Sequence, residues 1–387
     1  MTAPLRIALI APNRFPIRQP FAGGLEAHVW HLARALARLG HLVTLFAAPG
    51  SEPGPEYPSL AVEALTRSNA AAQRFPLPGA VIESDHHAYL TLMAELAQHG
   101  AARFDVIHNH SLHQIPIALA ARLRTPMVTT LHTPPFTWLE AAIAASGGRG
   151  GTFATVSRHT GAAWARVIGE VSVVPNGIDL RGWPMGPGGQ ELVWFGRITP
   201  EKGPHFAIEA ARRCGRHLVL AGPIGNQDYF RDAIRPRLGK AATYAGHLDQ
   251  RQLAALVGHS AAALVTPLWD EPYGLVVAEA LACGTPVVAF ARGGIPEVVD
   301  ARSGRVVPNQ DVAAMAAAVT EVVGLSRSAV RDRAIANCCA HTMVASYLDI
   351  YRNVIAEQDI THDDRLLRTP SRPRASQQSV EHLRTPA

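Results

Sequence analysis

The sequence predicts an α/β protein in which two similar halves each contain a parallel β-sheet covered by helices. Three observations predict this fold class. The chain has 387 residues, more than the roughly 100–200 residues of one typical domain. Short apolar runs alternate with segments that have apolar residues at helical spacing, as expected for β-α-β units. A stretch rich in glycine and proline, residues 182–190, separates two such series.

The first half begins with a β-α-β unit. Residues 5–11 (LRIALIA) form an apolar run before Pro12, as expected for a buried parallel strand. Apolar residues then recur at helical spacing over 25–39, Gly40 ends this helix, and 41–47 (HLVTLFA) is the next strand. The same pattern predicts strands at 104–108, 126–131, 151–157 and 170–174 and helices at 115–124 and 158–168.

The second half repeats this alternation after residue 185. Its predicted strands are 191–195, 217–221, 242–244, 262–266, 286–290 and 306–307, and its predicted helices are 204–214, 253–260, 274–283 and 312–323. We therefore predict an N-terminal Rossmann-like domain over residues 1–180 and a C-terminal one over 181–341.

The C-terminal end is predicted to contain one more helix and a tail. Over residues 342–357, Met343, Tyr347, Ile350 and Val354 fall on one helical stripe. Residues 358–387 contain few apolar side chains and are mildly basic, so we expect a disordered tail.

Composition excludes several classes of protein. The net charge is +5, with a pI of about 9.3, which is too mild to indicate a nucleic-acid-binding protein, although it leaves open a weak peripheral contact with a membrane surface. The four cysteines form no C-x-x-C pair, which predicts reduced thiols. The sequence has no signal-like N-terminus and no apolar run of membrane-spanning length, so we predict a cytoplasmic protein.

Two cations follow the first strand of the second half. Arg197 and Lys202 lie in the loop between Phe195 and a helix that begins with Pro204. Ligands of open α/β sheets bind beyond the carboxyl ends of the strands, and a helix start favours an anion. The sequence therefore indicates a diphosphate site here, although an ordinary solvated loop with two surface cations has the same local pattern.

Two glutamates lie eight residues apart around a predicted helix start. Glu271 precedes Gly274, and Glu279 lies on the helix in the almost wholly apolar segment GLVVAEALACG. Helical rise places them about 10 Å apart, too far to flank one bond as a glycosidase acid and base. They could instead bind hydroxyls at two ends of one elongated ligand. The alternative is a helix-surface role for Glu279, but a carboxylate among apolar residues is costly without a partner.

Glycines and histidines mark the first half. Eleven residues separate Ala11 from Gly23 and Gly24, with Glu26 following, so these glycines do not form the tight G-x-G-x-x-G fingerprint of dinucleotide-binding proteins. His110 and His132 each follow a predicted strand, and His132 is the better functional candidate. We predict no metal site, because there is no H-E-x-x-H, no paired cysteine and no D-x-D, and because His108 and His110 would point to opposite faces of a continued strand.

These motifs, in their order and spacing, resemble the family-4 retaining glycosyltransferases of the GT-B fold. The resemblance extends from about residue 6 to residue 357. Its further landmarks are the segments DVIHNH (105–110), LHT (131–133), VPNGID (174–179), GTPVV (284–288) and Gly293-Gly294 with Glu297.

The resemblance implies two Rossmann-like domains facing each other across a central cleft, with a nucleotide-sugar, most often a UDP-sugar, held by the C-terminal domain. Arg197 and Lys202 would bind its diphosphate, helped by backbone amides at Gly274, Leu275 and Val276. Glu279 would bind the ribose and Glu271 the donor sugar. The nucleobase would lie near Gly222, Pro223, His247 and Leu248.

The resemblance also assigns the acceptor side. The N-terminal domain would bind a carbohydrate, a lipid-linked or a small-molecule acceptor, with Gly23 and Gly24 near the diphosphate and His110 and Thr133 on the acceptor side. His132 would line the reaction centre, and His132, Glu271, Arg197 and Lys202 would form the catalytic set. The implied reaction retains the anomeric configuration and uses neither a cofactor nor a metal ion. The final helix would cross back onto the N-terminal domain.

Two other functions stay open at this point. A catalytically silent sensor or scaffold could bind nucleotide-sugars on the same fold, although the complete set of Arg197, Lys202, Glu271 and Glu279 favours an enzyme. A nicotinamide-dependent dehydrogenase is disfavoured by the missing fingerprint. The sequence identifies neither the sugar nor the acceptor, whose loops we expect over residues 49–87 and 134–149.

Overall fold

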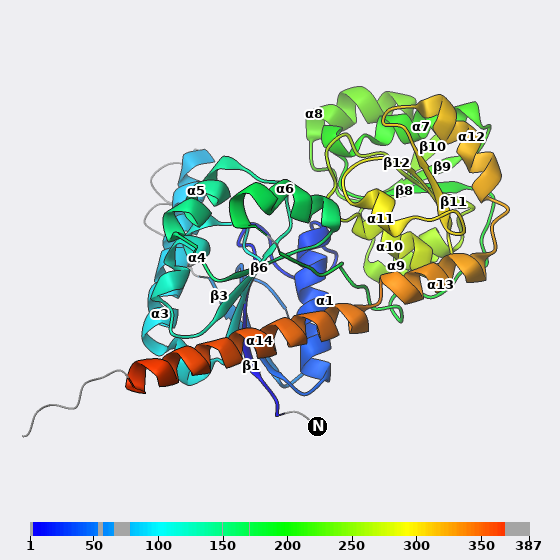
Figure 1. Cartoon of the computed structure of the whole chain (residues 1–387). Coiled ribbons are helices and arrows are strands. Elements are labelled where there is room, and N and C mark those ends of the chain that lie inside the picture. Colours follow the sequence, from blue (N-terminus) through cyan, green and yellow to red (C-terminus); the bar gives the residue numbers. More distant parts are fainter. Residues whose placement is uncertain (1–2, 53–56, 66–77, 149, 170, 368–387) are drawn as a thin grey trace, which may run out of the picture.

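Two parallel β-sheets with helices on both faces form the two lobes of the molecule (Figure 1). The computed structural model describes residues 3–52, 57–65, 78–148, 150–169 and 171–367. The first sheet has the order β3-β2-β1-β4-β5-β6-β7. Its strands are β1 (Arg6–Ile10), β2 (Leu42–Ala47), β3 (Leu60–Ala64), β4 (Val106–Asn109), β5 (Met127–Leu131), β6 (Thr152–Thr155) and β7 (Ser172–Val173). The helices of this lobe are α1 (Gly24–Arg38), α3 (Pro78–Arg103), α4 (Gln114–Leu119), η1 (Ala120–Arg122), α5 (Thr137–Ser146) and α6 (Arg158–Ile168).

The second sheet has the order β10-β9-β8-β11-β12-β13. Its strands are β8 (Leu192–Phe195), β9 (Leu218–Ala221), β10 (Ala242–Tyr244), β11 (Ala262–Val265), β12 (Val287–Phe290) and β13 (Gly304–Val307). The helical segments are η2 (Pro200–Lys202), α7 (Pro204–Arg213), α8 (Gln227–Tyr229), η3 (Phe230–Ile234), η4 (Arg235–Arg237), α9 (Gln250–Gly258), α10 (Leu275–Ala282), α11 (Ile295–Val298), α12 (Val312–Val322), α13 (Arg327–Asn337) and α14 (Ala340–Leu367).

The central strands β8, β9, β11 and β12 are apolar and buried along their whole length, as expected for a parallel sheet covered by helices on both faces. In β8, Val193 and Phe195 face a core shared with α10, whereas Leu192 and Trp194 face a core shared with α7 and α12. In β1, alternate residues likewise enter two cores, one with α1 and one with α3. Period-two alternation therefore assigns each side chain to one of two buried layers.

The strand order reverses at an equivalent place in each sheet. The chain moves outward from β1 through β2 and β3 and then restarts on the other side of β1 with β4, and the second sheet does the same around β8 and β11. Crevices open at the carboxyl ends of the strands at such switch points. The topology therefore predicts a binding site at the carboxyl ends of β1, β4, β8 and β11.

Helix α14 returns from the second lobe and packs on the first (Figure 1, orange to red). Tyr347 and Tyr351 are fully buried in the core that also contains α1 and β1. The Tyr351 hydroxyl lies 2.6 Å from Nδ1 of His108, and the hydroxyls of Tyr347 and Thr130 lie 3.1 Å apart. Helix α14 therefore connects the two lobes through the chain itself, and its stripe of apolar residues packs on the first lobe.

A carboxylate of the second lobe also caps a helix of the first. Glu297, on α11, accepts hydrogen bonds from the backbone amides of Arg158 and His159 at 3.0 and 2.8 Å. These amides belong to the first turn of α6, where no intrahelical partner is available. Next to this contact, a Cβ on Gly294 would lie 2.9 Å from Cβ of Ser157, so the lobes approach closely only because residue 294 is glycine.

The structure differs from the sequence-based expectations mainly at segments without a clear apolar period. Strand β3 and helix α3 occupy parts of 49–87, and α5 occupies most of 134–149, both expected as loops, while residues 53–56, 66–77 and 149 lie outside the described part. Helix α13 was also not predicted. Helix α14 continues to Leu367, so residues 358–367 are not the disordered tail that we expected, and 368–387 lie outside the described residues.

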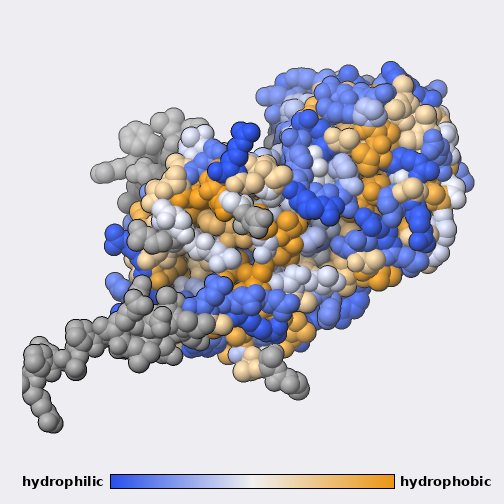
Figure 2. All heavy atoms as spheres, viewed as in Figure 1, coloured by the Kyte–Doolittle hydropathy of each residue, from blue (hydrophilic) through white to orange (hydrophobic). Residues whose placement is uncertain are grey.

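The surface is of mixed polarity, with hydrophilic residues over α8 at the upper edge of the second lobe (Figure 2). Within the described residues, no single helix combines the length and hydropathy of a membrane span. The one pair that passes by length and composition together, α12 and α13, is bent by 109° at its break.

Tyr351→Phe tests how α14 is held. The substitution removes the hydroxyl that pairs with His108 and leaves a buried ring nitrogen without its partner, which costs about 1–3 kcal/mol. We expect the urea midpoint to fall by a corresponding amount at an unchanged m-value. Asn353→Ala, on the exposed side of the same helix, is the matched control and should change stability by less than about 0.5 kcal/mol. Equal stability of Tyr351→Phe and the wild-type protein would contradict the proposed anchoring.

Candidate active site

A pocket of about 390 Å³ lies between the two lobes, at the carboxyl ends of the strands where each sheet reverses its order. The first lobe lines it with the segment Phe21–Leu25 at the start of α1 and with residues after β5. The second lobe lines it with the ends of β8, β9 and β11 and with the start of α10. The pocket is therefore built by both halves of the chain.

The pocket brings together nearly all the residues singled out from the sequence. Those that line it are Gly23, Gly24, His132, Thr133, Arg197, Lys202, Gly222, Pro223, His247, Leu248, Glu271, Gly274, Leu275, Val276 and Glu279. His110 does not line it but lies directly behind His132, because Nδ1 of His110 and Nε2 of His132 are 2.8 Å apart.

The N-termini of two helices from different lobes meet at this pocket. Helix α1 begins at Gly24 and α10 at Leu275, and a Cβ on Gly24 would lie only 3.1 Å from Cδ1 of Leu275. Gly274, which precedes α10, has φ of +88°, a value that favours glycine. Unpaired amides and the positive ends of two helix dipoles therefore face one cavity, which favours an anion there.

Arg197 is held at the pocket by close approach of two loops. A Cβ on Gly222 would lie 2.0 Å from the carbonyl oxygen of Gly196, so the loops after β8 and β9 can only touch with glycine at 222. The Arg197 guanidinium also reaches the first lobe, where a Cβ on Gly23 would lie 3.4 Å from its Nη2. Its buried Nε has no hydrogen-bond partner. The Arg197 side chain is therefore held at the cavity with its Nε–H group available to a ligand.

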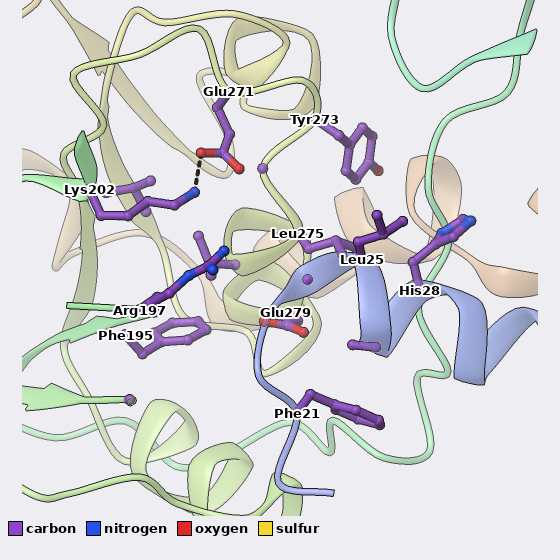
Figure 3. Close-up of a pocket in the computed structure, with 18 of the residues that line it drawn as sticks. Phe21, Leu25, His28, Phe195, Arg197, Lys202, Glu271, Tyr273, Leu275 and Glu279 are labelled. Atoms are coloured by element: carbon purple, nitrogen blue, oxygen red, sulfur yellow. Dashed lines mark hydrogen bonds and ion pairs between the residues drawn. The ribbon is translucent and has the colours of Figure 1, made fainter. Parts of the chain in front are cut away.

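Lys202 and Glu271 form an ion pair on the wall of the pocket (Figure 3). Nζ of Lys202 lies 2.5 Å from Oε2 of Glu271, and both side chains are largely buried, at 24% and 17% exposed. Trp269 donates a hydrogen bond from Nε1 to the same oxygen at 3.0 Å, and its ring centroid is 5.1 Å from the Lys202 ammonium. The carboxylate is therefore oriented by two donors and leaves its second oxygen toward the cavity.

Two further carboxyl groups near the pocket are affected by burial. Burial raises the pKa of Glu279 to about 8, and no hydrogen bond to its side chain is present within the described residues. Burial also raises the pKa of Glu26, at the start of α1, although the positive charges of Arg197 and Arg14 act in the opposite direction. Near neutral pH, Glu279 therefore retains a proton that it can donate to a ligand.

Three histidines gather at one wall of the pocket, where His28 and His132 line it and His110 lies behind them. His28 on α1, His110 after β4 and His132 after β5 have ring centroids 4.9–5.3 Å apart. Burial lowers the pKa of His28 to about 3 and holds the pKa of His110 and His132 well below the ordinary value. All three imidazoles are thus neutral at physiological pH.

The arrangement of these rings corrects one expectation. We expected His108 and His110 to point to opposite faces, and used this to argue against a metal site. Residues two apart in a strand lie on the same face, so the period of the strand itself places these two side chains together, and their rings lie 3.9 Å apart. That argument is therefore wrong.

Several pocket residues were missed from the sequence. His28 lies one turn after Gly24 on the helix that these glycines begin, and that spacing was an available signal. Trp269 directly precedes the Asp270-Glu271 segment, but nothing in the sequence indicates that its indole would meet Glu271 and Lys202. Phe21 belongs to an irregular loop, and its carbonyl oxygen contacts His247 across the pocket at 3.1 Å.

Glu279→Gln tests the raised pKa. Between pH 5 and 8 the unfolded chain ionises at residue 279 while the folded protein keeps the proton, so wild-type stability falls as the pH rises through this window. Glutamine cannot ionise. We expect Glu279→Gln to be more stable than wild type by roughly 1–3 kcal/mol at pH 8, with the difference shrinking toward pH 5.

Melting temperatures measured from pH 5 to 8 check this expectation. Glu191→Gln, at an exposed position, should follow the wild-type pH profile and serves as the control. Parallel profiles for wild type and Glu279→Gln would show that residue 279 ionises normally in the folded protein.

Comparison with known proteins agrees with this architecture. The family models "Glycosyltransferase Family 4" and "Glycosyl transferases group 1" match residues 22–181 and 189–324. Glycogen synthase of Mycobacterium tuberculosis is 33% identical over 360 residues, which cover 82% of this chain and 86% of that protein. D-inositol 3-phosphate glycosyltransferase of Mycolicibacterium smegmatis is 30% identical over 402 residues, covering 90% and 92%.

Solved glycosyltransferase structures share the two-lobed fold. AviGT4, involved in avilamycin A biosynthesis, is 26% identical with a TM-score of 0.67, covering 91% of this chain and 98% of that one. Anabaena HepE, solved with UDP and glucose, is 20% identical with a TM-score of 0.71, covering 89% and 99%, and shows likeness of fold alone. The expected fold class is confirmed: this chain has the GT-B fold and belongs to glycosyltransferase family 4.

Proposed function

We propose that this glycosyltransferase moves a hexose from a UDP-sugar to an acceptor hydroxyl with retention of the anomeric configuration and without a metal ion. The observation that carries the proposal is the convergence of Arg197, Lys202 and the N-termini of α1 and α10 on one cavity. Four sources of positive potential at one place match the diphosphate of a nucleotide-sugar. The solved complexes of HepE with UDP and with UDP-glucose support a donor of this class.

The donor extends on both sides of this diphosphate position. Glu279 lines the same pocket, where its carboxyl group would bind the ribose hydroxyls, and Gly222, Pro223, His247 and Leu248, which also line it, would surround the nucleobase. Glu271 lies on the other side and accepts from hydroxyls of the donor sugar. Hydrogen bonds between these carboxyl groups and the vicinal hydroxyls of the donor would fix how the donor lies in the pocket.

The acceptor enters from the first lobe. His132 and Thr133 directly follow β5 and line the cavity, and His110 supports His132 from behind through its 2.8 Å contact. The acceptor class, whether a carbohydrate, a lipid-linked or a small molecule, depends on the segments around α3 and α5. Neutral His132 presents a polar ring to the reaction centre without adding a competing positive charge.

Catalysis rests on positioning and on charge. The acceptor hydroxyl attacks the anomeric carbon on the face from which UDP departs, and its proton passes to the leaving phosphate oxygen. Arg197, Lys202 and the helix amides stabilise the negative charge that develops on that diphosphate. Because Lys202 also pairs with Glu271, one ion pair links the leaving-group site to the sugar-hydroxyl site. Approach of the two lobes excludes water from the cavity.

The alternative function is a catalytically silent nucleotide-sugar sensor. Both functions predict that UDP-sugars stabilise the folded protein by mass action and so raise its melting temperature. At a hundredfold excess of UDP-sugar over its Kd, the gain in free energy of unfolding is about 2.7 kcal/mol. Only an enzyme releases UDP faster when the correct acceptor is present. A thermal-shift screen of nucleotide-sugars, followed by a UDP-release assay with an acceptor panel, separates the two.

For the enzyme, we expect a UDP-hexose to give the largest thermal shift. We also expect NMR of the product to show the anomeric configuration of the donor. Inversion would contradict the proposed same-face attack, and stabilisation by a nucleotide-sugar without turnover for any acceptor would favour the sensor.

Lys202→Ala tests the leaving-group role. The variant loses one of two cations at the diphosphate and leaves Glu271 half-buried without its counter-ion, so we expect kcat to fall by about 10²-fold. Lys240→Ala, at an exposed position, is the matched control and should keep wild-type turnover. Wild-type turnover in Lys202→Ala would exclude this role for the ammonium group.

A further inference from the structure

The histidine cluster behind the pocket has the arrangement of a metal site. His28, His110 and His132 come from α1 and from the ends of the adjacent strands β4 and β5. One ring nitrogen from each lies within 4.8 Å of one from both others. His28 and His132 line the pocket, so the cluster faces the cavity on one side.

The same rings have unused hydrogen-bonding capacity. Among the residues that the structure describes, neither Nδ1 nor Nε2 of His28 has a hydrogen-bond partner, and Nε2 of His110 has none. Both side chains are buried, at 1% and 0% exposed. A buried polar group without a partner typically costs about 1–3 kcal/mol, and a neutral imidazole has one lone-pair nitrogen, so His28 and His110 can each offer one nitrogen to a metal ion.

A second layer of contacts orients the cluster. His108 stacks at 3.9 Å behind His110, and its own nitrogens are occupied by the hydroxyls of Tyr351 and Thr130 at 2.6 and 2.7 Å. These contacts fix His108 in place and leave it out of the cluster. They also limit how far His110 can rotate away from His28 and His132.

The donor set selects a class of ligand. Neutral imidazole nitrogens suit Zn²⁺ and related divalent transition ions, whereas Mg²⁺ and Ca²⁺ prefer oxygen. Three histidines with one open position form a known type of zinc coordination. For zinc–nitrogen bonds of about 2.0–2.1 Å, tetrahedral ligand atoms are roughly 3.3–3.4 Å apart, so the three rings must rotate to bring ligand atoms together that now lie within 4.8 Å of one another.

We propose that His28, His110 and His132 form a binding site for a divalent transition-metal ion such as Zn²⁺, and that the bound ion inhibits the enzyme. The metal-binding part stands independently of the proposed function. Inhibition rests on that function, because an ion at His132 occupies the place of the donor sugar and adds positive charge next to the reaction centre. The site is therefore inhibitory and not a cofactor site.

His28→Leu is the decisive variant. It removes one ligand and replaces a buried ring that has two unpartnered nitrogens with an apolar side chain, so we expect the variant to fold and to be at least as stable as wild type. His31→Leu is the matched control: His31 lies one turn further along α1 and lines the same pocket but is outside the cluster.

Metal binding is measured directly on the full-length protein without a histidine tag. Visible absorption follows Co²⁺ binding, and competition with Zn²⁺ gives the Zn²⁺ affinity. We expect tetrahedral Co²⁺ bands for wild type and for His31→Leu, and at least about 100-fold weaker binding for His28→Leu. Zn²⁺ should also raise the melting temperature of wild type but not that of His28→Leu. Equal affinity in wild type and His28→Leu would overturn the site.

Activity measurements test the inhibitory role separately. Micromolar Zn²⁺ should inhibit transfer by the wild-type protein and by His31→Leu, and EDTA should leave turnover unchanged or raise it. If Zn²⁺ binds through His28 but turnover is unaffected, the inhibitory role is wrong although the site is real. Loss of activity in EDTA, restored by Zn²⁺, would make the ion a cofactor and contradict the proposal. Absence of any transferase activity would refute the proposed function and leave the Co²⁺ result intact.

Discussion

Concentration of positive charge at one cleft is the constraint on which the rest of the site depends. The N-termini of α1 and α10, Arg197 and Lys202 converge from two lobes on a pocket of about 390 Å³. Such a pocket is stable without its ligand only if part of this charge is compensated internally. Glu271 does so for Lys202, and Glu26 lies beside Gly23 and Arg197. The diphosphate that we propose would add its negative charge to these contacts.

Close approach within the site requires glycine at defined places. Between the lobes, Gly24 faces Leu275 and Gly294 faces Ser157, and within the second lobe Gly222 faces Gly196. At each of them a Cβ would lie within about 3 Å of the opposite atoms. Glu297 capping α6 and α14 returning to the first lobe hold this approach in register. The dimensions of the pocket are therefore determined by contacts outside it. One of these contacts joins Tyr351 of α14 to His108, which lies next to the cluster of His28, His110 and His132.

Unfavourable burial is concentrated at functional groups. Glu279 remains in an apolar helix with a pKa of about 8, and His28 is buried with two unpartnered nitrogens. Both arrangements lower the stability of the free protein, and both would be relieved by the ligands that we propose, hydroxyls at Glu279 and a metal ion at His28. This pattern distinguishes a binding site from ordinary core packing.

The sequence by itself determined the two α/β halves, the return helix and most of the pocket residues. Apolar runs buried on both faces, helical stripes and motif spacing are local signals, and each reports the environment of its own segment. The sequence could not reveal α3 and α5, whose apolar periodicity is weak, or where α14 ends. Nor could it show the ion pair of Lys202 with Glu271, which are 69 residues apart, or the histidine cluster. Those contacts were decided only by the tertiary structure, because the meeting of strand ends and helix starts depends on how the two sheets pack and not on any one segment.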